Sequence, residues 1–108
     1  MNFEISRTDE FSKHLKQLAK KYPSIKNDFA ALLESLQQNA RQGSALGKNC
    51  YKIRMKIASK KAGKSGGARV ITFIKLEYKH IFLLDIYDKS EKGSLGDKEL
   101  LALLKKVD

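Results

Sequence analysis

Hydrophobic residues recur with two different spacings along the chain. In its first third they lie three and four positions apart, which predicts two amphipathic helices separated by a short break at Tyr22–Ser24. Thr8 and Ser24 stand where the N-caps of these helices belong, and Pro23 ends the first helix. Because the break is short, we expect a helical hairpin. An alternating stretch at residues 2–6 predicts a strand before it.

After Gly43 the spacing changes to two, which is the period of a β-strand. In CYKIRMKIA, residues 50–58, apolar side chains point to one side and three cations point to the other: Lys52, Arg54 and Lys56. Residues 69–77 and 80–87 predict two further strands. Their apolar residues fall on both faces, which is typical of strands in the middle of a sheet.

Asp97 is placed to cap a last helix that contains four leucines. The predicted order is therefore β-α-α-β-β-β-α, an α+β fold in which consecutive strands are antiparallel. Residues 1–108 are long enough for a single domain with its own core. We expect the helical hairpin to cover one face of the sheet, and the opposite face to carry the cations of the 50–58 strand.

Positive charge is concentrated in the middle of the chain. The 22 Lys and Arg against 12 Asp and Glu give a net charge of +10. Ten of these cations, but only the acid Glu77, lie between residues 48 and 79. Like charges gathered in this way repel one another, which favours a polyanionic partner such as nucleic acid. For the 50–58 strand alone, lysines that protect a sheet edge from pairing are an alternative explanation.

The stretch KKAGKSGG, residues 60–67, contains a Gly-Lys-Ser like the end of a nucleotide-binding P-loop. That loop needs a glycine at position 58, where this chain has Ala58, and it leads into a helix rather than a strand. We therefore interpret the stretch as a flexible cationic arm between two strands, whose glycines let its lysines approach phosphates closely.

Other features restrict the class of protein. Cys50 is the single cysteine, so no internal disulfide is possible, and a reducing compartment is expected. We find no Cys/His spacing typical of a metal site and no apolar run long enough for a signal peptide or a membrane span. The sequence therefore predicts a cytoplasmic protein that acts without a metal or another cofactor.

Three short segments, read with the element order, carry a family resemblance. CYKIRM opens the strand at residue 50, GARVI opens the next strand, and IYDKSE spans the end of the last core strand. Together they resemble the RelE/ParE superfamily of bacterial toxins, with the HigB-like members of the RelE branch as the nearest match. The resemblance implies a toxin of a type II toxin–antitoxin system. Such a toxin cleaves messenger RNA in the A site of the ribosome and is held inactive by a partner antitoxin.

The resemblance also implies site residues. The RelE pattern places functional cations at Lys52, Arg54, Arg69 and Lys89, and HigB-like members use the strand end that holds Tyr87 and Asp88 here. A tyrosine that RelE carries slightly later has no counterpart in EKGSLGDK. The groups that transfer protons are therefore not assigned. Lys52 or Lys89 is the candidate base, and Tyr87 is the alternative proton donor. We expect further lysines to contact RNA: Lys48, Lys56, Lys60, Lys61 and Lys64.

Alternatives remain at several points. The chain also fits a ParE-type poison of DNA gyrase, or an RNA- or DNA-binding module without catalytic activity. Phe73 is interpreted as a core residue or as a surface on which a base stacks. The leucines of the last helix fit either the core or a docking surface for an antitoxin. His14, on the exposed side of its helix, and His80, at a turn, are expected to be structural.

Overall fold

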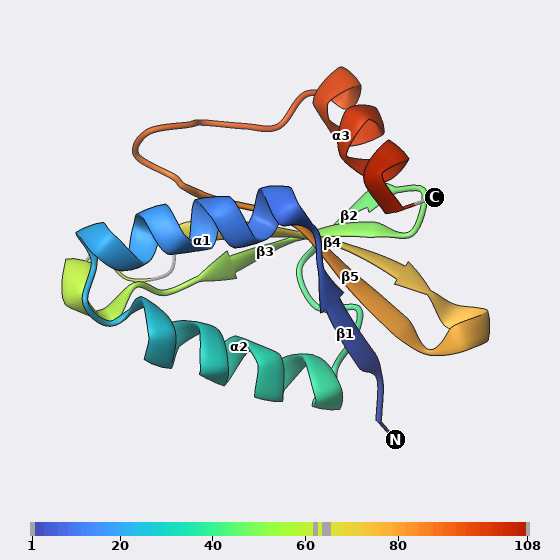
Figure 1. Ribbon diagram of the computed structural model, residues 1–108, viewed down its shortest axis with the longest axis horizontal. Helices are drawn as coiled ribbons and strands as arrows, with labels where there is room; N and C mark the ends of the chain where they lie inside the picture. The colour runs from blue at the N-terminus through green and yellow to red at the C-terminus, as the bar shows by residue number, and fades with distance from the viewer. Residues whose placement is uncertain (1, 62, 64–65, 108) are drawn as a thin grey trace.

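A five-stranded sheet with the spatial order β1-β5-β4-β3-β2 forms the centre of the protein (Figure 1). The computed structural model describes residues 2–61, 63 and 66–107. The strands are β1 Glu4–Arg7, β2 Ser44–Gly47, β3 Cys50–Met55, β4 Ala68–Lys75 and β5 His80–Asp88. The helices are α1 Asp9–Lys21, α2 Ile25–Gln38 and α3 Asp97–Leu104, with short 3₁₀ turns at Ala58–Lys60, Leu76–Tyr78 and Lys105–Val107. The predicted α+β class is confirmed.

The sheet has one strand more than predicted. β2 carries no strong alternation, and it becomes a strand because it pairs with β3 around a tight turn. Lys48 and Asn49 form this turn, with φ angles of 55° and 61° in the left-handed region. The strands β2 to β5 are antiparallel to their sequence neighbours, as expected, whereas β1 runs parallel to β5.

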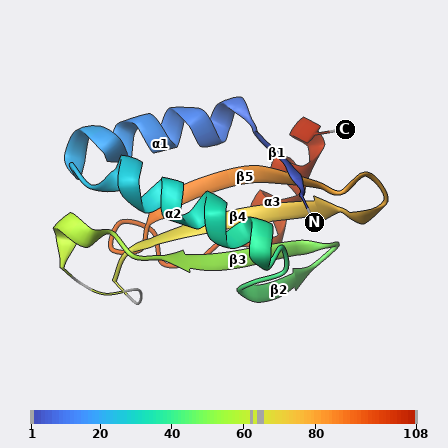
Figure 2. The same cartoon turned by 90° about the horizontal axis from the view of Figure 1, so that it is seen from below.

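The predicted helical hairpin covers one face of the sheet (Figure 2). The Thr8 hydroxyl accepts a hydrogen bond from the Phe11 amide at 3.1 Å, which confirms Thr8 as the cap of α1. Ser24 occupies the N-cap position of α2, but its hydroxyl donates to the Asp28 carboxylate instead of capping the backbone. Phe11 is fully buried and its ring lies 5.5 Å from that of Phe29, so α1 and α2 share one core.

The opposite face is not purely cationic, because α3 packs on part of it (Figure 1). The cluster under α3 consists of Cys50, Ile71, Leu84, Tyr87, Leu100 and Leu103. Burial raises the pKa of the Cys50 thiol to about 11, so this cysteine stays protonated. Leu100 and Leu103 are therefore core residues, while Leu101 remains 45% exposed.

Two local predictions were wrong. Asp97 does not cap α3; Gly96 holds that position, and its amide donates to the Glu99 carboxylate at 3.3 Å. Leu76 does not continue β4, because the strand ends at Lys75 and the chain turns in a short 3₁₀ segment that leaves Leu76 45% exposed. Among the residues that the structure describes, no helix is both long and apolar enough to traverse a bilayer.

Candidate active site

Two arginines and a tyrosine form a row across the middle of the sheet. In the register of the antiparallel pairs, Arg54 on β3 lies opposite Arg69 on β4, and Arg69 lies opposite Tyr87 on β5. Directly opposite residues point to the same face with their Cβ atoms about 5 Å apart. We call these three residues the arginine–tyrosine row. Lys52 lies two residues before Arg54 and therefore on the same face, opposite Ile71.

A β-bulge decides which residue of β5 joins this row. Phe73 pairs with Phe82 and Thr72 with Leu83, but Ile71 pairs with Asp85, so Leu84 is an extra residue. Without the bulge, the register that pairs Phe73 with Phe82 would place Ile86 opposite Arg69 and would turn Tyr87 toward the helical hairpin. With it, Tyr87 faces the α3 side and Asp88 faces the other side.

Arg54 differs in exposure from the other two residues of the row. Arg54 is exposed, whereas Arg69 is 4% and Tyr87 8% exposed. The Arg69 guanidinium donates to the Ala68 carbonyl at 3.2 Å. Two like charges directly opposite each other on neighbouring strands repel, and a phosphate held between them would relieve this repulsion. The guanidinium groups of Arg54 and Arg69 therefore favour binding of an anion at this point of the sheet.

The Tyr87 hydroxyl is buried and has no hydrogen-bond partner among the described residues. Burial raises the pKa of Tyr87, and the charges of Lys92 and Arg69 oppose this only in part. The phenol is therefore protonated at neutral pH. A buried hydroxyl without a partner is costly, so its position opposite Arg69 makes it a candidate for a hydrogen bond to a ligand.

Asp88 has the opposite character. Its carboxylate accepts hydrogen bonds from the Tyr22 hydroxyl at 2.6 Å, the Lys60 ammonium at 2.7 Å, and the Ser90 amide and hydroxyl at 2.9 and 2.7 Å. Burial by itself raises the pKa of Asp88, but the hydrogen bonds from Lys60, Tyr22 and Ser90 outweigh burial and hold this pKa well below its usual range. We call these four residues the Asp88 latch. It ties the end of β5 to α1 and to the turn after β3.

The two lysines that follow β5 differ in their contacts. The Lys89 ammonium donates to the Gly93 carbonyl at 2.9 Å, and the backbone amide of Lys89 donates to the Gly67 carbonyl at 3.0 Å. The Lys92 ammonium lies 5.3 Å from the centre of the Tyr87 ring and pairs with Glu99. Sequence reasoning missed Lys92, because the loop that brings it back over Tyr87 has no regular pattern.

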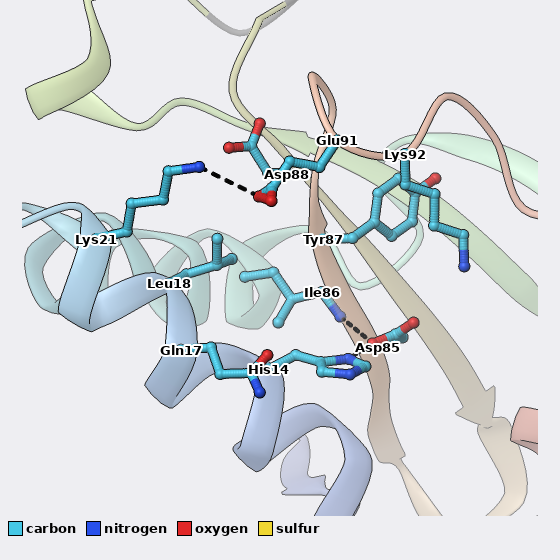
Figure 3. Close-up of a pocket in the computed structure, with 10 residues that line it drawn as sticks. All are labelled: His14, Gln17, Leu18, Lys21, Asp85, Ile86, Tyr87, Asp88, Glu91 and Lys92. Atoms are coloured by element: carbon cyan, nitrogen blue, oxygen red, sulfur yellow. Dashed lines mark hydrogen bonds and ion pairs between the residues drawn. The ribbon is translucent and has the colours of Figure 1, made fainter.

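A pocket of about 390 Å³ opens beside Tyr87, between α1 and the end of β5 (Figure 3). On its wall a His14 ring nitrogen and the Asp85 carboxylate are 2.6 Å apart, and Asp85 is only 5% exposed. His14 is thus half-buried rather than on an exposed helix face. His80 stacks on Phe82 at 4.1 Å and hydrogen-bonds Ser6 at 2.7 Å. Both histidines are held by structural contacts, as expected.

The five lysines predicted to bind RNA are not gathered in one place. Lys48 is exposed in the turn before β3, whereas Lys56 and Lys61 are exposed after the other end of this strand. Lys60 belongs to the Asp88 latch, and Lys64 lies outside the described residues. Phe73 is half-buried and stacks on Phe82 with ring centres 6.0 Å apart, as part of the cluster under α3.

Comparison with known proteins identifies the fold. No protein-family model matches the chain, and no curated protein sequence matches it either. Among solved structures, a double-arginine mutant of the E. coli toxin RelE in the free state is similar over 100% of both chains, with a TM-score of 0.64 and 14% sequence identity. The isolated E. coli RelE toxin matches 95% of this chain and 97% of its own, with a TM-score of 0.51 and 16% identity. The chain has a RelE-like fold. Assignment to the HigB-like branch stays a prediction.

Within this RelE-like fold, the arginine–tyrosine row combines two chemical capacities. Guanidinium groups present paired N–H donors that match phosphate oxygens, and a protonated phenol donates a proton. Lys52, half-buried on the same face, adds an ammonium group. The described residues contain no group of three or more His, Cys, Asp or Glu placed to hold a metal ion. The guanidinium and phenol groups of the row are suited to binding a phosphodiester and to giving a proton.

Proposed function

We propose that this protein is the toxin of a type II toxin–antitoxin system, an endoribonuclease that cleaves messenger RNA on the ribosome and so inhibits translation. The observation that carries the proposal is the arginine–tyrosine row, in which a buried, protonated phenol, Arg69 and Arg54 follow one another on neighbouring strands of one sheet face. The RelE-like fold and the excess of positive charge support the same function.

The proposed reaction is an intramolecular transesterification. The ribose 2′-oxygen attacks the adjacent phosphorus, the P–O5′ bond breaks, and the products end in a 2′,3′-cyclic phosphate and a 5′-hydroxyl. A base takes the proton of the 2′-hydroxyl, and an acid gives a proton to the departing 5′-oxygen. Arg54 and Arg69 stabilise the charge that develops on the phosphate oxygens. Tyr87 is the proposed acid and Lys52 the proposed base.

The other predicted site residues take lesser parts in this proposal. Asp88 acts through the latch that positions Tyr87, and Lys89 is engaged by the Gly93 carbonyl. Arg54 is open to a phosphate directly, whereas Arg69 and Tyr87 are reached only when neighbouring side chains move aside. The proposed partners are the ribosome with its message and a cognate antitoxin, and the proposed location is the cytoplasm.

The test is a translation reaction with purified components in which the cuts in the message are mapped. Arg54→Ala removes an exposed side chain, so the fold should persist while the cleavage rate falls by about 10²-fold or more. Arg69→Lys keeps the charge but loses the planar fork, and we expect a similar loss. Lys26→Ala removes an exposed cation of α2 and serves as the matched control.

Codon-spaced cuts that disappear in both arginine variants would support the nuclease. Intact message together with gyrase-dependent DNA damage would instead support the ParE-type activity. Intact message without DNA damage would leave only a nucleic-acid-binding function, and either result would overturn the proposal.

A further inference from the structure

We propose that Lys92 is a further phosphate-binding residue of the active site, and that Glu99 occupies its ammonium group until RNA displaces the carboxylate. The inference rests on the proposed function and adds a residue that the family resemblance does not indicate.

Lys92 extends the arginine–tyrosine row beyond the sheet. Its ammonium lies 5.3 Å from the centre of the Tyr87 ring, and Figure 3 shows its side chain running alongside that ring. Arg69 flanks Tyr87 on the β4 side by register. The phenol therefore has two cations close to it, and a phosphodiester whose leaving oxygen reaches the Tyr87 hydroxyl comes within reach of both.

Lys89, which the resemblance indicates, is less well placed. Its ammonium is engaged by the Gly93 carbonyl within its own loop. Lys92 and Arg69 are the cations whose charges oppose the rise in the pKa of Tyr87, in that order. In the loop after β5, Lys92 is thus the residue whose charge acts on the Tyr87 phenol.

Glu99 behaves as an internal substitute for the phosphate. Its carboxylate pairs with the Lys92 ammonium and also accepts the Gly96 amide at 3.3 Å. The ion pair is at the surface, with side chains 34% and 49% exposed, so it is weak and easily exchanged. Because α3 keeps the Gly96–Glu99 cap when the pair opens, the exchange does not require the helix to unfold.

The experiment uses the full-length protein on ribosome-bound message, under single-turnover conditions, over a range of toxin concentrations. Lys92→Ala should lower the cleavage rate at saturation by about 10²-fold, and Lys92→Arg should restore part of it. Glu99→Gln keeps the cap on Gly96 but removes the charge, so the half-saturating concentration should fall by up to about fivefold. Lys98→Ala, next to Glu99 and exposed, is the control and should stay within about twofold.

A second measurement separates phosphate binding from a structural role. Binding of a non-cleavable RNA oligonucleotide is followed as a function of salt concentration. Lys92→Ala should reduce the slope of log affinity against log salt concentration by about one unit, which corresponds to one lost phosphate contact. Lys98→Ala should leave the slope unchanged.

The outcomes distinguish this inference from the proposed function. A wild-type saturated rate for Lys92→Ala, with Arg54→Ala inactive, would overturn the role of Lys92 and leave the nuclease standing. Wild-type rates for both variants would overturn the active site proposed at the arginine–tyrosine row, and a message left intact by the unmodified protein would contradict the nuclease itself. An unchanged half-saturating concentration for Glu99→Gln would overturn the part assigned to Glu99.

Discussion

Tyr87 and Asp88 are adjacent in the sequence, yet they stand in opposite kinds of environment. The Asp88 carboxylate on one face of the sheet accepts four hydrogen bonds from the latch, and these keep it ionised. The Tyr87 hydroxyl on the other face has no partner among the described residues. A polar group whose bonds are complete stabilises the fold, whereas one whose bonds are missing is available for a ligand. The comparison therefore assigns different roles to two adjacent residues: we expect Asp88 to stabilise the fold and Tyr87 to contact a ligand.

Replacing the phenol should have the largest effect. Tyr87→Phe should lower the rate of message cleavage by about 10² to 10⁴, because the proposed proton donor is lost. Stability should not fall, since the buried hydroxyl that is removed makes no hydrogen bond to the described residues. Single-turnover cleavage checks the prediction for the rate, and denaturant unfolding of the same preparations checks the prediction for stability. A variant that cleaves normally would remove Tyr87 from the chemistry.

Breaking the latch should give the reverse pattern. Asp88→Asn should reduce the free energy of unfolding by about 3 kcal/mol, because it leaves the partly buried Lys60 ammonium without its carboxylate. Cleavage by the protein that remains folded should fall much less than in Tyr87→Phe. Urea unfolding curves and rates normalised to folded protein measure this. A stable but inactive Asp88→Asn would place Asp88 in the chemistry after all.

Acid should weaken the latch gradually. Because the folded-state pKa of Asp88 is depressed, its stabilisation is present above the unfolded pKa of about 3.9 and is lost as the pH falls below that value. The contribution declines by about 1.4 kcal/mol for each pH unit in this range. Unfolding free energies between pH 6 and pH 3 should show the loss in the wild type. The slope of unfolding free energy against pH should be shallower in Asp88→Asn. Equal slopes in the two proteins would show that the loss of stability does not come from the latch.

Local patterns predicted the helices well and the long-range pairings less well. The three-and-four spacing and the Thr8 cap place α1 correctly, because both depend on residues within a turn of one another. β2 was missed, since Ser44–Gly47 is a strand only through its bonds to β3. The parallel pairing of β1 with β5 joins residues such as Glu4 and His80, which are 76 positions apart, and no local signal specifies it.

The candidate site divides in the same way. Alternation along CYKIRM correctly put Lys52 and Arg54 on one face, opposite the helical hairpin. Whether Tyr87 or Ile86 lies opposite Arg69 depends on the bulge at Leu84, which a single strand does not reveal. The place of Lys92 depends on an irregular loop and on an ion pair with α3.

The sequence by itself determined the α+β class, the helical hairpin, the cationic strand and the concentration of positive charge. These properties follow from the periodicity and composition of short segments, which each segment carries alone. The tertiary structure decided the strand register, the face on which each residue of β5 lies, and the lysine that covers Tyr87. These depend on contacts between distant segments, and a single extra residue in one strand is enough to invert them.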